Sequence, residues 1–196
     1  MARARGWMVA LIVCAGLCTR ASAQELITNG GFENTDEDGV VLNWVYSGEG
    51  VGPATSAAHS GFLGMEFFSY GEPATLTQSG ISTIYNHEYL VGFWLYNDEW
   101  LADYPKSFTV NFDGTLYDVG AGPTPGEWTH YSFYAAGTGN ANASLQFAGQ
   151  YDTGSWYLDD VSVYKTGNVV PEPSLMQLPF LLGLAGLGYW HRRRRA

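Results

Sequence analysis

Aromatic, amide and carboxylate side chains follow one another closely near the middle of the chain. Trp94 and Tyr96 alternate along an apolar run, and Asn97, Asp98 and Trp100 come directly after them. Aromatic rings stack on the apolar faces of sugar rings, while amides and carboxylates hydrogen-bond the sugar hydroxyls. These five residues therefore predict a carbohydrate-binding surface. The alternative is that the rings only serve packing, because tryptophan is highly buried on average.

Motifs that would indicate an enzyme are missing from the sequence. There is no Gly-x-Ser-x-Gly turn to carry a nucleophilic serine. His87-Glu88 is not followed by the second histidine of a zinc-protease helix. We therefore expect a protein with no catalytic residues. A polysaccharide hydrolase stays open as an alternative, because it needs only two carboxylates at a suitable separation, which a sequence does not measure.

The central region of the chain carries a strong negative charge. Of the 196 residues, 9 are Lys or Arg and 19 are Asp or Glu, and most of the basic residues stand near the two ends. Residues 24–170 hold only Lys106 and Lys165 against 18 acidic residues, a formal net charge of −16. Such a surface repels nucleic acid and anionic lipid headgroups. We expect no nucleic-acid partner.

Short apolar runs broken by Gly, Asn, Asp and Pro fill residues 24–168, and no long helical period occurs. Asp113-Gly114 between two runs predicts a tight hairpin, because both residue types accept positive φ angles. Strand alternation places Trp94 and Tyr96 on one face. Eight or more strands predict one all-β domain, an antiparallel sandwich or jelly roll. The expected strands are 42–46, 64–69, 74–78, 89–96, 108–112, 115–117, 128–135, 143–148 and 156–164.

Motifs at the two ends of this domain carry a resemblance to a known family. The domain opens with Leu-Ile-Thr-Asn-Gly-Gly-Phe-Glu at 26–33 and closes with Trp-Tyr-Leu-Asp-Asp-Val-Ser-Val at 156–163. With Trp44 and the Tyr-x-x-x-Phe-Trp-Leu strand at 89–95, this pattern resembles the carbohydrate-binding modules of the galactose-binding-like superfamily. The resemblance covers residues 25–165 and implies a jelly-roll fold. It is less specific for function, because one fold serves many binding roles.

The same resemblance implies a structural Ca²⁺ where the first and last strands meet. Carried over by position, its ligands are Glu33, the loop around Ser60, and Asp159 or Asp160. Calcium takes mixed carboxylate and carbonyl oxygens, and acidic residues on adjoining strands repel without a cation. Strand alternation turns Asp159 and Asp160 to opposite faces, so we expect only one of them, Asp159 in preference, to face the site. The alternative is that these residues only cap strand ends.

Residues 1–23 have the features of a secretory signal peptide. A positively charged start precedes an apolar run at 7–17, and small residues at Ala21 and Ala23 fit the requirement of signal peptidase. We expect cleavage after Ala23. Both cysteines lie inside this segment, so the mature chain, beginning at Gln24, would contain no disulfide and no thiolate metal site.

Residues 169–196 contain a Pro-Glu-Pro box, an apolar run at 175–190 and a basic tail, in that order. This arrangement resembles the PEP-CTERM sorting signal of exported bacterial proteins. The run is shorter than the ~20 residues of an ordinary spanning helix, which suits transient anchoring in the inner membrane. The basic tail would stay on the cytoplasmic side. The resemblance implies processing by an exosortase, and the signal residues are Pro171, Glu172, Pro173, Arg192, Arg193, Arg194 and Arg195.

Taken together, the sequence predicts an exported, non-enzymatic protein of the cell envelope or extracellular matrix. Its single jelly-roll domain would bind or organise extracellular polysaccharide, as in a biofilm, with Ca²⁺ as a structural ion. A purely structural matrix protein without a specific glycan is the first alternative, and a polysaccharide hydrolase is the second.

Overall fold

The computed structural model describes residues 24–98, 106–120 and 122–169. The expected signal peptide, Trp100, the Pro-Glu-Pro box, the C-terminal apolar helix and the Arg tail lie outside these residues. Within the described ranges, no helix has the length and apolar character needed to cross a membrane.

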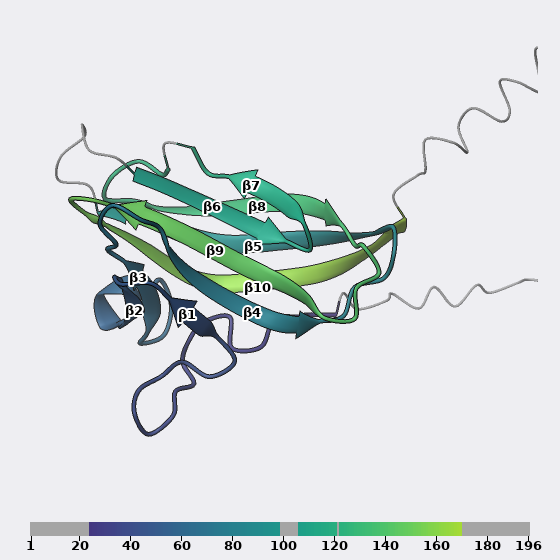
Figure 1. The fold of residues 1–196 in the computed structure, drawn as a ribbon, viewed down its shortest axis with the longest axis horizontal. Helices are drawn as coiled ribbons and strands as arrows, with labels where there is room; N and C mark the ends of the chain where they lie inside the picture. The colour runs from purple at the N-terminus through teal and green to yellow at the C-terminus, as the bar shows by residue number, and fades with distance from the viewer. Residues whose placement is uncertain (1–23, 99–105, 121, 170–196) are drawn as a thin grey trace, which may run out of the picture.

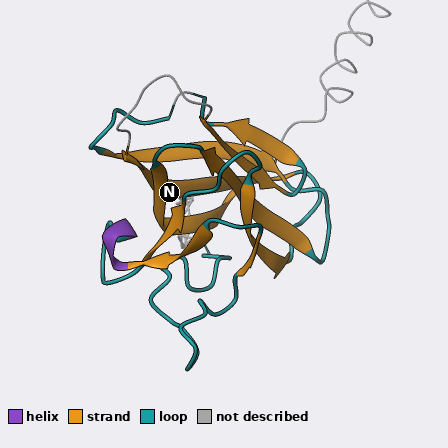
Figure 2. Cartoon of the chain, turned by 60° about the vertical axis from the view of Figure 1, so that its left-hand side comes forward, coloured by secondary structure: helices purple, strands orange, loops and turns teal. Residues whose placement is uncertain are grey.

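Two five-stranded antiparallel sheets face each other and form a sandwich (Figures 1 and 2). One sheet has the strand order β1-β4-β9-β6-β7, and the other has the order β2-β3-β10-β5-β8. A single turn of 3-10 helix at Thr55–Ala57 is the one helical element among the described residues. The strands are β1 (Val45–Ser47), β2 (Val51–Ala54), β3 (Gly64–Phe67), β4 (Ala74–Ile81), β5 (His87–Asp98), β6 (Lys106–Phe112), β7 (Thr115–Asp118), β8 (Trp128–Ala136), β9 (Ala143–Tyr151) and β10 (Ser155–Val169).

The expected all-β sandwich is confirmed, and most of the strands lie where the apolar runs predict them. The hairpin between β6 and β7 turns at Asp113 and Gly114, whose φ angles are 48° and 89°. One strand, β2, was not predicted, because Gly52 and Pro53 mark a turn in a sequence. Here they lie in a strand that pairs only with β3, at the edge of its sheet, where a missing N–H is tolerated.

Aromatic side chains fill the space between the two sheets. Phe93 from β5 meets Phe147 from β9 edge to face, with ring centroids 5.4 Å apart. Phe67 and Phe108 form a second such pair at 5.4 Å. Edge-to-face pairs contribute about 0.5–1.5 kcal/mol each beyond the area they bury. Because alternate residues of every central strand are committed to this core, the others must face outward.

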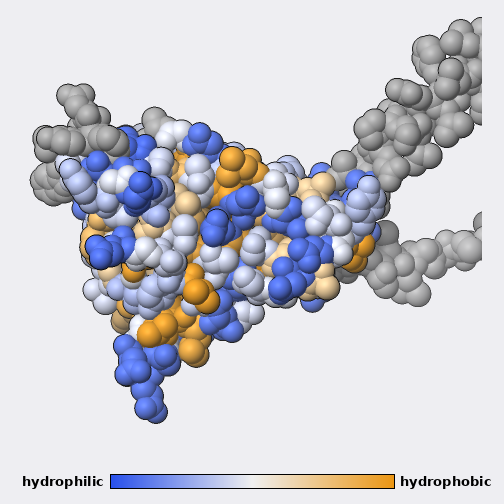
Figure 3. All heavy atoms as spheres, in the orientation of Figure 1, coloured by the Kyte–Doolittle hydropathy of each residue, from blue (hydrophilic) through white to orange (hydrophobic). Residues whose placement is uncertain are grey.

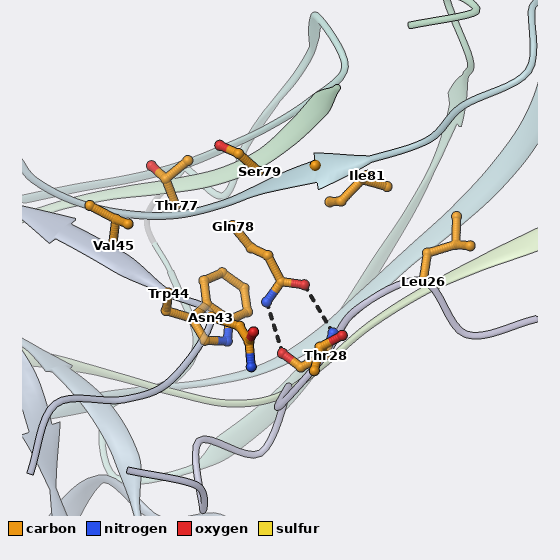
Figure 4. Close-up of a pocket in the computed structure, with 10 residues that line it drawn as sticks. Leu26, Thr28, Asn43, Trp44, Val45, Thr77, Gln78, Ser79 and Ile81 are labelled. Carbon is orange, nitrogen blue, oxygen red and sulfur yellow. Dashed lines mark hydrogen bonds between the residues drawn. The ribbon is translucent and has the colours of Figure 1, made fainter. Parts of the chain in front are cut away.

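The two ends of the domain are tied together. Glu25 forms a β-bridge with Tyr164 of β10, and Leu26 N donates to Val163 O at 2.9 Å. The buried Gln78 side chain holds the same segment from the other sheet, because its amide accepts from Thr28 N at 2.9 Å and donates to Thr28 O at 2.8 Å (Figure 4). The opening segment is therefore fixed to both sheets.

Gly30 sets how closely the opening segment approaches β10. Its carbonyl accepts a 2.9 Å hydrogen bond from Val161 N, and a Cβ atom at this position would overlap the Val161 carbonyl group. Only a glycine can make this approach. The adjacent Gly31 is different, because the nearest atom to its Cβ position is Asp160 Oδ1 at 3.8 Å.

We expect Gly30→Ala to lower the free energy of unfolding by about 2 kcal/mol, because the added methyl group forces the opening segment away from β10. Gly31→Ala is the matched control and should change it by less than about 0.5 kcal/mol. Urea unfolding followed by tryptophan fluorescence measures both. Equal stability of the two variants would contradict the proposed contact.

Candidate functional site

The regular pleat of β10 is broken at the Asp159-Asp160 pair. Its register against β5 shifts between Asp159 and Ser162, and Asp160 has a φ of 48°. The resulting bulge turns both carboxylates toward the loop of residues 59–63. The expectation that only one of the two would face the site is therefore wrong, because it assumed an uninterrupted alternation.

Three carboxylates hold that loop by hydrogen bonds, and we call Glu33, Asp159, Asp160 and the loop 59–63 the acidic junction. Asp159 Oδ2 accepts from His59 N at 2.8 Å and from Ser60 N at 2.9 Å. Asp160 accepts from Ser60 Oγ at 2.7 Å and lies 2.7 Å from His59 Nδ1. Glu33 Oε1 accepts two further backbone N–H groups, from Phe62 at 2.8 Å and Leu63 at 3.0 Å.

Gly61 allows the loop to sit this close to Glu33. It has a φ of 66°, and a Cβ atom there would overlap the Glu33 carboxylate.

Asp159 is fully buried. Burial raises the pKa of its carboxyl to about 6, although the backbone N–H groups of Ser60, Asp160 and His59 act in the opposite direction. The ionised form is therefore costly here without donors or a cation beside it.

The four residues expected to bind calcium, Glu33, Ser60, Asp159 and Asp160, thus lie together around one loop. Their oxygens face N–H and O–H donors, but each carboxylate oxygen has further lone pairs. In the described part of the chain, no three His, Cys, Asp or Glu side chains are placed to hold a metal ion. The junction fits Ca²⁺ only if main-chain carbonyl oxygens complete the shell, which is a usual form of calcium site.

Aromatic side chains line up beside the junction, on the outer face of the sheet that contains β10. Tyr157 pairs with Tyr96 of β5, and Tyr96 pairs with Trp128 of β8, so the three rings form one line across three strands. We call them the aromatic row. The Tyr96 ring stacks on Tyr157 at 5.4 Å and packs against Trp128 at 5.5 Å. All three side chains are partly exposed.

Two carboxylates flank the aromatic row. Glu66 of β3 pairs with Tyr157, so it continues the same line on the next strand. Asp98 Oδ2 accepts from the Tyr157 hydroxyl at 2.9 Å, and Glu66 Oε1 accepts from Ser155 Oγ at 2.7 Å. Burial and the hydrogen bond to Asp98 raise the pKa of the Tyr157 phenol, so it stays a protonated donor. Rings and carboxylates of this kind together can hold a sugar.

Trp94 connects the aromatic row to the acidic junction. It lies on the same face of β5 as Tyr96 and pairs with Asp159 of β10. The His59 ring, held by Asp160, stacks on the Trp94 ring with centroids 4.1 Å apart and an interplanar angle of 16°. One face of the Trp94 indole is therefore already occupied by the protein. The junction loop thus fixes this ring.

The sequence-predicted sugar-binding residues are only partly brought together. Trp94, Tyr96 and Asp98 share the outer face of β5. The prediction that Asn97 binds a sugar at the surface is wrong, because its side chain is fully buried on the inner face of the sheet. Trp100 lies outside the described residues. Sequence reasoning missed Trp128, Tyr157 and Glu66, since strand pairing between distant segments has no local signal in the chain.

The outer face of the other sheet has a different character. Thr77, Gln146 and Asn111 form a line of hydroxyl and amide groups across β4, β9 and β6, and Gln146 Nε2 donates to Thr77 Oγ1 at 3.2 Å. Hydrophilic and hydrophobic side chains are interspersed over the face seen in Figure 3.

A groove of ≈ 430 Å³ lies along β4 near the opening segment (Figure 4). Two of its polar groups are engaged within the protein: the Gln78 amide is bonded to Thr28, and Trp44 Nε1 donates to Asn29 O at 2.9 Å. Asn43 and Ser79 also line the groove, and Trp44 is the one aromatic residue among the described residues that line it.

Comparison with known proteins supports the fold. No protein-family model and no curated protein sequence matches the chain. Among solved structures, it is similar to TmCBM61, solved with β-1,4-galactotriose, at 20% identity over 72% of this chain and 99% of that one, with a TM-score of 0.50. It is also similar to the CBM22-1 xylan-binding domain of Paenibacillus barcinonensis Xyn10C, at 14% identity over 77% of this chain and 98% of that one, with a TM-score of 0.53.

A further similarity is to the enzymatically active domain of tailspike protein 4 from bacteriophage CBA120, at 18% identity over 71% of this chain and 21% of that one, with a TM-score of 0.51. These likenesses establish a jelly-roll fold shared with carbohydrate-binding modules.

Proposed function

We propose that this protein is a non-catalytic polysaccharide-binding module. The observation that carries the proposal is the aromatic row of Tyr157, Tyr96 and Trp128, which is flanked by Glu66 and Asp98 on one sheet face. Three ring systems on neighbouring strands, with centroids 5.4 Å and 5.5 Å apart, offer apolar contact along a glycan chain. The flanking carboxylates supply hydrogen-bond acceptors for its hydroxyls. The fold shared with carbohydrate-binding modules adds support.

A binding role accounts for the geometry better than catalysis does. Glu66 and Asp98 each accept a hydrogen bond from a neighbouring hydroxyl group of the protein. A glycoside hydrolase of the usual kind needs one of its two carboxyl groups protonated as a general acid. In these contacts both carboxyl groups serve as acceptors and not as donors. The face therefore suits holding a glycan more than cleaving one.

We expect the purified protein to bind a soluble polysaccharide from a panel that includes xylan and β-1,4-galactan. Tyr96→Ala and Trp128→Ala should each weaken binding about tenfold or more, because truncating a central aromatic contact removes most of its binding energy. Isothermal titration calorimetry measures the affinity, and far-UV circular dichroism checks the fold.

Gln146→Ala is the control, since Gln146 lies exposed on the opposite sheet. Loss of binding in that variant alone would move the glycan site to the other face. A folded protein that binds no glycan of the panel would contradict the proposed function and favour a purely structural matrix protein.

We also propose that Ca²⁺ binds at the acidic junction as a structural ion. Three carboxylates gather around one loop there, and the described residues near them include no Lys or Arg side chain. A bound cation would relieve the cost of keeping the buried Asp159 ionised. The competing account is that the hydrogen bonds of the loop suffice without a metal.

Calcium at millimolar concentration should raise the melting temperature of the protein above its value in EDTA, because an ion that binds only the folded state stabilises it. Glu33→Gln should remove most of this rise. Magnesium is the control, since it demands a smaller octahedral site. Identical melting curves in calcium and in EDTA would contradict the calcium proposal. The hydrogen bonds of the loop would then suffice to hold the junction without a metal.

We propose further that the protein is exported and processed at both ends, which would place it in the cell envelope or extracellular matrix. The support is in the sequence: the signal-peptide features of residues 1–23 and the ordered Pro-Glu-Pro box, apolar run and Arg tail. Signal peptidase and an exosortase are the implied partners. The strongly acidic body, with its −16 formal charge, suits an extracellular location among divalent cations.

In a host that has an exosortase, mass spectrometry of the mature protein should give an N-terminus at Gln24 and a C-terminus near the Pro-Glu-Pro box. Replacing Pro171 and Pro173 by Ala should leave the C-terminal segment attached, because the box is then lost, while Ser174→Ala should not. Normal C-terminal processing of the double variant would overturn the assignment of the sorting signal.

A further inference from the structure

We infer that the aromatic row selects polysaccharides that carry free amino groups over those with only hydroxyl, acetamido or carboxylate substituents. This inference rests on the proposed function and names the ligand class of the same sheet face. Its basis is the combination of the stacked rings with two carboxylates: Glu66 continues the row on a fourth strand, and Asp98 accepts from the Tyr157 hydroxyl beside it.

The first step concerns the carboxylates. Glu66 and Asp98 each accept one hydrogen bond from a hydroxyl group, through Glu66 Oε1 and Asp98 Oδ2. Within the described residues, the second oxygen of each carboxylate accepts no hydrogen bond, and neither side chain forms an ion pair. A ligand at the aromatic row therefore meets two negative charges that retain acceptor capacity.

The second step concerns the positive charges of the domain, which lie elsewhere. Lys106 Nζ lies 5.6 Å from the centre of the Tyr151 ring, and Lys165 lines a pocket beside the opening segment. These are the only Lys or Arg residues between positions 24 and 170. The two histidines near the row are engaged, since His59 pairs with Asp160 and His130 packs on Trp94 at 5.3 Å. No basic side chain of the described residues is placed to receive a uronic acid or sulfate group.

The third step concerns the rings themselves. An ammonium group over the face of a Trp or Tyr ring, within about 6 Å of its centre, is attracted by the ring quadrupole. Tyr157 lies next to both carboxylates, since it pairs with Glu66 and donates to Asp98. An amino sugar at this end of the row would therefore bring its ammonium group beside a ring and both carboxylates. Cation–π attraction and ion pairing then act in the same place. The −16 charge of the central region draws a polycation and repels a polyanion.

Three β-1,4-linked tetrasaccharides that differ only at the second carbon of each sugar provide the test. Cellotetraose has a hydroxyl group there, tetra-N-acetylchitotetraose an acetamido group, and chitotetraose an amino group. We expect the full exported protein, at mildly acidic pH, to bind chitotetraose about tenfold more tightly than cellotetraose. Added salt should reduce this preference, because exposed charges are screened.

Charge-neutralising variants identify the source of the preference. Glu66→Gln and Asp98→Asn should each reduce the ratio of the chitotetraose affinity to the cellotetraose affinity several-fold, because the amide keeps an acceptor oxygen for a sugar hydroxyl but loses the negative charge. Glu37→Gln is the matched control, because Glu37 is exposed in the turn between Asp36 and Gly39, outside the strands that carry the row, and its loss changes the total charge equally. Tyr96→Ala should weaken binding of both sugars, which separates the contribution of the ring from that of the carboxylates.

The outcomes separate this inference from the proposed function. Equal or weaker binding of chitotetraose than of cellotetraose would overturn the inference and leave glycan binding intact. An unchanged preference in both Glu66→Gln and Asp98→Asn would also overturn it, because the charge selection would then lie elsewhere. Binding of none of the three tetrasaccharides, nor of any polysaccharide in the wider panel, would overturn the proposed function itself.

Discussion

A buried carboxylate without a basic partner is the constraint on which this structure depends. Asp159 is fully shielded from solvent, and the described residues place no Lys or Arg beside it. Its charge is instead met by backbone N–H groups of His59, Ser60 and Asp160. Because an unsatisfied buried charge would cost several kcal/mol, the loop 59–63 has to stay on β10.

The position of that loop decides the form of the neighbouring sheet face. His59 is held by Asp160 and stacks on Trp94, so the loop covers one end of the outer face. The remaining rings, Tyr157, Tyr96 and Trp128, lie on paired strands in the middle and edge of the same sheet. Rings fixed in this way lose little further freedom when a ligand binds, which favours affinity. The acidic junction and the aromatic row are therefore parts of one rigid arrangement.

The two outer faces of the sandwich differ in the types of side chain at their outward-facing positions. One sheet presents hydroxyl and amide groups such as Thr77, Gln146 and Asn111, and the other presents rings and carboxylates. Both faces cover the same aromatic core, in which Phe93 meets Phe147 between the sheets. The inner positions are thus dictated by packing, whereas the outer positions are free to carry a function. A jelly roll can take up different ligands in this way without a change of core.

The sequence by itself determined the fold class, most strands, the Asp113-Gly114 hairpin and the face shared by Trp94 and Tyr96. These features depend on local alternation and turn chemistry, which neighbouring residues express directly. The sequence also predicted that Glu33, Ser60 and the Asp159-Asp160 pair lie in one calcium site, but this prediction came from the resemblance to a family. Only the tertiary structure decided that both aspartates face the loop, because a bulge depends on the partner strand. The tertiary structure also decided that the Asn97 side chain is buried. It placed Glu66, Tyr157 and Trp128 in line with Tyr96, since the pairing of distant strands depends on the packing of the whole domain.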